Sequence, residues 1–153
     1  MIFTTKAEYG VRLLIELGRR DGQPPVSLKA VAERERLPLA YLERIAALLK
    51  KAGLLTATRG AHGGYLLARP PSEITMDAVV LALEGAIAPM DCFFDDREGR
   101  VSCAHHEEET QQHCATKLLW TRVQLGVIKS LQGTTLAELV EFAERPPAVP
   151  ATY

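Results

Sequence analysis

No apolar run in this sequence approaches the roughly 20 residues that a helix needs to cross a bilayer, although 47% of the 153 residues are hydrophobic. The first six residues also lack the basic-then-apolar order of a signal peptide. We therefore expect neither a membrane span nor secretion, and we place the protein in the cytoplasm.

The usual groupings of catalytic residues are missing as well. The sequence has no nucleophile with a paired base, no phosphate-binding glycine loop before a helix and no pair of catalytic carboxylates. An enzyme is therefore not expected.

Cysteine is scarce, and its few residues are clustered. The three cysteines have ten residues between each successive pair and are Cys92, Cys103 and Cys114. An odd number cannot form disulfides without leaving one thiol over, and clustered thiolates in the cytosol favour metal binding. The spacing predicts one site for an iron-sulfur cluster or zinc, with a fourth ligand still to be found. The histidines near these cysteines are His105, His106 and His113, which are chemically suited to that place.

The net charge of −1 conceals two halves of opposite sign. Residues 1–75 carry 12 Lys+Arg and 7 Asp+Glu, whereas residues 76–153 carry 6 and 12, so the halves are +5 and −6. A basic front half suggests that this end faces a polyanion, although chance clustering on a solvated surface explains the charge equally well.

Three segments near the start of the chain have apolar residues at helical intervals. The first spans residues 5–17. The second follows Ser27, a suitable N-cap, and Pro38 opens the third, for which Gly53 is the expected stop. We therefore expect three consecutive helices.

The pattern then changes to that of a hairpin. Residues 54–58 and 65–67 predict two short strands, and residues 59–64 between them form a basic, glycine-rich tip. Three helices followed by such a wing are typical of the winged helix-turn-helix, whose last helix enters the major groove of DNA.

This fold indicates which residues contact DNA. They are Ser27, Lys29, Tyr41, Glu43 and Arg44 from the helices and Arg59, Gly60, His62, Gly63 and Gly64 from the wing. The hydroxyl and amine of the second helix suit phosphates, and the wing suits a minor groove that its glycines let the backbone approach. Glu43 can accept a hydrogen bond from a cytosine amine. Its alternative role is an ion pair with Arg44 or Lys50.

The rest of the chain predicts a mainly α architecture with a long dimerisation helix. We expect helices at residues 75–84, 116–131 and 135–144, with the cysteine segment as a loop between the first two. The expected units are a DNA-binding domain at 1–72, a cluster-binding and dimerisation region at 73–145, and a flexible tail at 146–153. Residues 116–131 are apolar on nearly every side, which predicts a two-fold dimer. The alternative is a central helix within one chain.

The chain resembles a family of bacterial winged-helix repressors. The motifs that carry the resemblance are Tyr41-Leu42-Glu43, Gly53-Leu54-Leu55, Arg59-Gly60-x-x-Gly63-Gly64-Tyr65-Leu66-Leu67 and Cys114-x-x-x-x-Leu119-Trp120. This family includes IscR, NsrR and RirA, and the match covers residues 1 to about 143. The resemblance implies a homodimeric transcription regulator whose iron-sulfur cluster senses iron, cluster supply, redox state or nitric oxide.

The resemblance also suggests the fourth ligand. In the IscR branch a histidine follows the third cysteine by three positions, where this chain has Lys117, a poor ligand for iron when protonated. In other relatives an acidic residue at the position of Glu8 reaches the cluster of the partner subunit. Alternatively, Glu8 caps its own helix through a capping box with Thr5. Arg12, one turn further on, suits a hydrogen bond to a sulfide.

The ligand set fits either a [2Fe-2S] or a [4Fe-4S] cluster, with zinc as the runner-up. Two alternative functions stay open. One is a cluster-free or zinc-containing regulator that senses thiol oxidation. The other, of a different class, is a small iron-sulfur electron carrier.

Overall fold

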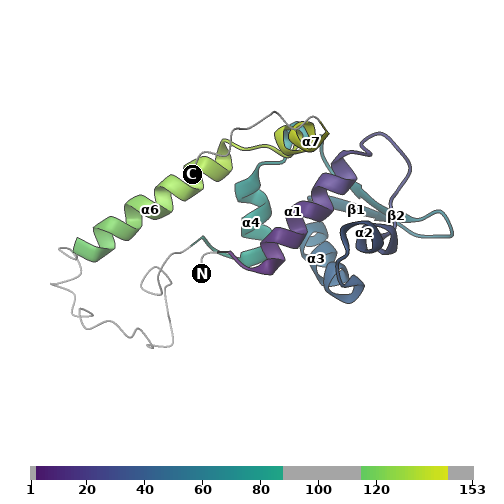
Figure 1. The fold of residues 1–153 in the computed structure, drawn as a ribbon, viewed down its shortest axis with the longest axis horizontal. Helices are drawn as coiled ribbons and strands as arrows, with labels where there is room; N and C mark the ends of the chain where they lie inside the picture. The colour runs from purple at the N-terminus through teal and green to yellow at the C-terminus, as the bar shows by residue number, and fades with distance from the viewer. Residues whose placement is uncertain (1–2, 88–114, 145–153) are drawn as a thin grey trace.

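The computed structural model describes residues 3–87 and 115–144, arranged as in Figure 1. The helices are α1 (Thr5–Gly18), α2 (Leu28–Glu35), α3 (Leu39–Lys51), α4 (Met76–Glu84), α6 (Ala115–Gln132) and α7 (Leu136–Glu144). The strands are β1 (Leu55–Thr58) and β2 (Gly64–Leu67), followed by the short 3-10 helix η1 (Pro71–Glu73). The expected mainly α fold with a two-stranded wing is confirmed.

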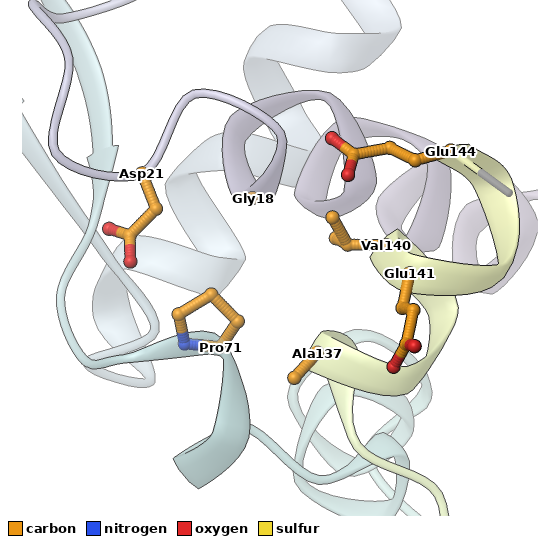
Figure 2. A pocket seen from close by; sticks show the side chains of 7 residues that line it. All are labelled: Gly18, Asp21, Pro71, Ala137, Val140, Glu141 and Glu144. Carbon is orange, nitrogen blue, oxygen red and sulfur yellow. The ribbon is translucent and has the colours of Figure 1, made fainter.

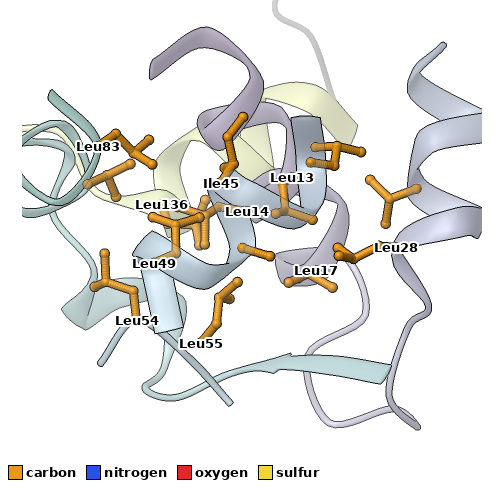
Figure 3. Close-up of a cluster of buried hydrophobic side chains, with 14 of the residues drawn as sticks. Leu13, Leu14, Leu17, Leu28, Ile45, Leu49, Leu54, Leu55, Leu83 and Leu136 are labelled. Atoms are coloured by element: carbon orange, nitrogen blue, oxygen red, sulfur yellow. The ribbon is translucent and has the colours of Figure 1, made fainter. Parts of the chain in front are cut away.

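Helix α1 lies at the centre of this arrangement. Its Leu13 and Leu14 are fully buried, and Figure 3 shows them within a cluster that includes Ile45 and Leu49 of α3 and Leu136 of α7. Because α4 and α7 pack on the same core as α1, α2 and α3, helix α1 joins the first three helices to these two later ones.

Two glycines let α1 approach its neighbours closely. A Cβ on Gly10 would collide with the Leu83 side chain of α4, and one on Gly18 would lie 2.7 Å from Cγ2 of Val140 in α7. The bare backbone at these positions therefore sets the spacing between α1 and the two later helices.

The start of α1 is capped from a distance. Thr4 is the N-cap, and its Oγ1 accepts from the Lys6 N–H at 3.2 Å. Oε1 of Glu84, at the end of α4, accepts from the N–H of Thr4 at 3.1 Å, its hydroxyl at 2.6 Å and the N–H of Ala7 at 3.3 Å. The predicted capping box of Thr5 and Glu8 is wrong, because Thr4 rather than Thr5 is the N-cap and the Glu8 carboxylate pairs with Arg12.

Backbone pairing joins the starts of α4 and α7. Thr75 and Thr135 form an antiparallel bridge, the N–H of Met76 donates to the carbonyl of Thr134 at 3.0 Å, and that of Leu136 donates to Ile74 at 2.8 Å. Helix α6 then projects from the body on the side opposite to the wing (Figure 1). None of the described helices is long and apolar enough to span a membrane.

The wing is fixed to the body by main-chain bonds. Strands β1 and β2 are antiparallel, with Leu55 opposite Leu67, and Val26 adds a third segment by exchanging bonds of 3.0 and 2.8 Å with Tyr65. This approach needs Gly64, because a Cβ there would lie 2.6 Å from the carbonyl carbon of Val26.

Glu84→Gln tests the distant cap. Burial raises the pKa of Glu84, but hydrogen bonds from Thr4 and Ala7 and the charge of Lys6 outweigh burial, so the pKa lies below its ordinary value. The carboxylate therefore adds stability above the unfolded pKa of about 4.3, and this contribution is lost as pH falls through the folded pKa.

We expect the substitution to lower the free energy of unfolding by about 1 kcal/mol at neutral pH. Urea unfolding at pH 7 and at about pH 3 measures the difference, which should shrink at the lower pH. Glu73→Gln, at an exposed position, is the control. An equal loss of unfolding free energy at both pH values would contradict the role of the Glu84 carboxylate as a cap.

Gly64→Ala tests the attachment of the wing. The new Cβ meets the backbone of Val26, which cannot move aside as a side chain can, so we expect a loss of about 1 to 3 kcal/mol. Thermal unfolding measures it, with Ala61→Gly at the exposed tip as the control. Wild-type stability for Gly64→Ala would show that the wing is not held at this point.

Candidate nucleic-acid interface

The helix-turn-helix begins at Ser27, which caps α2 as expected. Its Oγ accepts from the N–H of Ala30 at 3.2 Å, which leaves the hydroxyl proton available to a phosphate. Lys29 is exposed, and its Nζ lies 4.0 Å from Oε1 of Glu33, a contact that costs little to break. Both side chains are therefore accessible to a DNA backbone.

The first turns of α3 present one half-buried and two exposed candidates. Tyr41 packs edge-on against Tyr9 of α1, with ring centroids 5.7 Å apart and an interplanar angle of 83°. Glu43 and Arg44 are exposed, and neither forms a salt bridge within residues 3–87 and 115–144. The alternative pairing of Glu43 with Arg44 or Lys50 is therefore not observed, and its carboxylate is free to face a base.

The wing tip divides into exposed side chains and structural glycines. Arg59 and His62 are exposed at the turn. Gly60 has a φ of 117°, which side chains rarely adopt, and a Cβ on Gly63 would collide with the carbonyl of Thr58. The glycines that the sequence suggested for DNA approach thus have a sufficient reason within the hairpin itself.

Charge pairing separates two groups of cations. Arg12 Nε lies 3.2 Å from Oε1 of Glu8 and 3.9 Å from Oε2 of Glu35, so its charge is paired at the surface of the body. The cations of residues 3–87 that have no salt bridge to another described residue are Arg20, Arg36, Arg44, Lys50, Lys51, Arg59 and Arg69. Most of them lie on the turn after α2, on α3 and on the wing, which makes this face the one suited to a polyanion.

Sequence reasoning misses a buried carboxylate behind this face. The Glu16 side chain is 3% exposed and contacts Arg19 and Arg34, the latter with Nε 3.1 Å from Oε2. Arg19 also donates to the carbonyl of Ala143 in α7 at 3.3 Å. Glu16 therefore links α1, α2 and the end of α7. The i,i+3 spacing from Glu16 to Arg19 was the only local sign of it.

A hollow of about 410 Å³ lies between the end of α1, η1 and α7 (Figure 2). It is lined by Gly18, Asp21, Pro71, Ala137, Val140, Glu141 and Glu144. The three carboxylates around it repel phosphates, so the DNA backbone is not expected on this side.

Only some of the expected metal ligands are among the described residues. The cysteines and the candidate histidines, Cys92, Cys103, Cys114, His105, His106 and His113, lie outside the described residues. Glu8 is described, and its side chain is 62% exposed with Arg12 as its ion-pair partner. Lys117 lies in the first turn of α6. Within residues 3–87 and 115–144, no group of three metal-binding side chains is present.

Comparison with known proteins supports this fold and a role in transcription regulation. The chain is 36% identical over 143 residues to the protein rrf2 of Nitratidesulfovibrio vulgaris, a match covering 94% of this chain and 89% of that protein. The structure of CymR, the global cysteine regulator of B. subtilis, has a TM-score of 0.72 and 34% identity and covers 93% of this chain and 98% of its own. IscR of T. potens has the same TM-score and identity, with coverages of 98% and 93%.

A family model described as an iron-dependent transcriptional regulator matches residues 3–142. Its extent includes the helix-turn-helix, the wing and the helices that follow. The resemblance to regulators that include IscR is thus confirmed, and the protein is a DNA-binding transcription regulator rather than an enzyme. The chain belongs to the Rrf2 family of transcriptional regulators.

Proposed function

We propose that the protein is a cytoplasmic homodimeric repressor whose iron-sulfur cluster changes its affinity for a two-fold operator. The proposed ligands are Cys92, Cys103, Cys114 and Glu8. The observation that carries the proposal is that Glu84 accepts hydrogen bonds from Thr4 and Ala7 at the start of α1. The segment that contains the cysteines follows shortly after Glu84 in the sequence. The first turns of α1, with Glu8, are fixed by these bonds relative to the end of α4 in the same chain, so a bond from Glu8 to the cluster of the partner subunit would tie the two subunits together.

The carboxylate of Glu8 is available for a ligand bond. Its side chain is 62% exposed, and its ion pair with Arg12 is a surface contact, which typically contributes less than about 1 kcal/mol. Three thiolates with one carboxylate suit iron, and the weaker oxygen ligand suits a site that must release its metal. The description of the family as iron-dependent supports the same choice.

Coupling to DNA follows from the position of α1. Glu8 and the core residues that contact α3 lie on this one helix. A ligand bond at Glu8 would bias the position of α1 relative to the DNA-reading helix. A coupling of about 1 to 3 kcal/mol corresponds to a change in operator affinity of roughly 5- to 150-fold.

The apolar surface of α6 supports the dimer. No residue of this helix is buried, and Leu118, Leu119 and Leu125 are 57%, 55% and 59% exposed. The alternative of a central helix within one chain does not fit the described residues, which leave these side chains uncovered. A second copy related by a two-fold axis would cover them.

A cluster-free regulator is the second candidate. The similarity to CymR, named a cysteine regulator, favours it, and zinc remains the runner-up metal. The electron carrier is not supported, because the relatives are named as transcriptional regulators.

Glu8→Ala tests the cluster and its coupling together. We expect altered absorbance and Mössbauer spectra of anaerobically purified protein, and an operator affinity changed roughly 5- to 150-fold. An operator can be selected from random-sequence duplexes. Glu73→Ala, another exposed carboxylate, is the control. Unchanged spectra and unchanged affinity would defeat the role of Glu8, and metal analysis finding zinc or no iron would favour the alternatives.

Leu118→Glu combined with Leu125→Glu tests the dimer. The two positions are seven apart on one face of α6, and burying a charge at each should raise the dimer dissociation constant at least about 100-fold. Sedimentation velocity measures the change, and Ser130→Glu, at an exposed position on another face of the same helix, is the control. A double variant that still sediments as the wild-type dimer would place the interface elsewhere.

A further inference from the structure

Arg36, in the turn between α2 and α3, has an unfavourable backbone conformation. Its φ of 55° and ψ of 45° are left-handed, and within residues 3–87 and 115–144 it is the one non-glycine residue with a positive φ. Glycine is the usual residue at this place after a helix, because a Cβ is disfavoured there. A left-handed arginine in a functional region therefore needs an explanation.

The turn itself does not need the arginine side chain. The backbone N–H groups of Arg36 and Leu37 both donate to the carbonyl of Ala32, the second at 2.9 Å. Leu37 then enters the core with 8% exposure. These bonds involve only the backbone of residue 36, so glycine would make the same turn at a lower cost.

The two preceding charged side chains are occupied, whereas that of Arg36 is not. Arg34 Nε lies 3.1 Å from Oε2 of the buried Glu16, and Oε2 of Glu35 lies 3.9 Å from Nε of Arg12. Arg36 is exposed and forms no salt bridge within the described residues. Its guanidinium is thus without an ion-pair partner in the turn that leads into α3, the helix that carries the exposed Glu43 and Arg44.

We propose that Arg36 binds a phosphate of the DNA backbone and that this contact is the reason for an arginine in a left-handed turn. A guanidinium presents a planar fork of donors that matches phosphate oxygens. Such a contact reads no base and fixes the register in which α3 enters the groove. The inference rests on the DNA binding of the family, and it assigns a residue that the sequence motifs do not.

The proposal predicts opposite effects on stability and on DNA affinity. Arg36→Gly and Arg36→Asn remove the charge and tolerate the left-handed conformation, whereas Arg36→Lys keeps both the charge and the backbone conflict. The glycine variant should melt about 2 to 4 °C higher than the wild type. Both uncharged variants should bind duplex DNA roughly fivefold or more weakly, with a salt-dependence slope smaller by about one per protomer.

The experiment measures binding of the full chain to random-sequence duplex DNA and to a selected operator over a range of salt concentrations. We expect Arg36→Gly and Arg36→Asn to lose affinity equally for both DNAs. Arg36→Lys should keep the wild-type dependence of affinity on salt. Arg20→Gln, at the end of α1 beside the residue that contacts α7, controls for net charge and should leave the slope unchanged.

Three results would overturn the proposal. The first is wild-type affinity and salt-dependence slope for both uncharged variants. The second is a loss of affinity for the selected operator only. The third is a loss of affinity for Arg36→Gly alone with an unchanged slope, which would indicate that flexibility of the turn is the cause. A wild-type protein without salt-dependent binding to any duplex would contradict the DNA-binding function itself, and Arg36 with it.

Discussion

The close contact of α1 with α4 and α7 is the constraint on which the rest of the structure depends. Gly10 and Gly18 permit it, because side chains at these positions would meet Leu83 and Val140. With its other side against α3, α1 has little freedom to move by itself. A packed interior responds to a displacement by repacking rather than by gradual deformation. A shift of α1 relative to α3 therefore requires the side chains between the two helices to repack.

Electrostatics divides the molecule in a way that the total charge conceals. The arginines that hold elements together are matched by carboxylates, as with Arg34 at the buried Glu16 and Arg12 between Glu8 and Glu35. A buried ion pair fixes geometry more than it adds stability. The remaining cations are free to interact with another molecule. Whether a charged patch can bind another molecule therefore depends less on its sign than on whether its charges already have ion-pair partners.

Local signals in the sequence predict most of the fold, and non-local contacts limit the prediction. The Ser27 cap and the Gly53 stop depend on neighbours a few residues away, and both are confirmed. The first helix begins at residue 5 as predicted, but its capping is mispredicted because Glu84, 80 residues from Thr4, accepts hydrogen bonds at the start of α1. The exposed candidates for DNA contact follow from pattern and charge. The left-handed conformation of Arg36 could not be predicted, because no neighbouring residue indicates it. The cysteine ligands lie outside the described residues, so that prediction stays open.

The attachment of the wing has a consequence for how this protein can diverge. Its strands are joined to each other and to Val26 through the main chain, and Gly64 provides the space for that approach. The side chains of Arg59 and His62 take no part in holding it. Substitutions of these two side chains, unlike those of Gly60 and Gly63, are therefore expected to change stability little. If the wing contacts DNA as proposed, changes at Arg59 and His62 would let related regulators bind different operators while the helices stay unchanged.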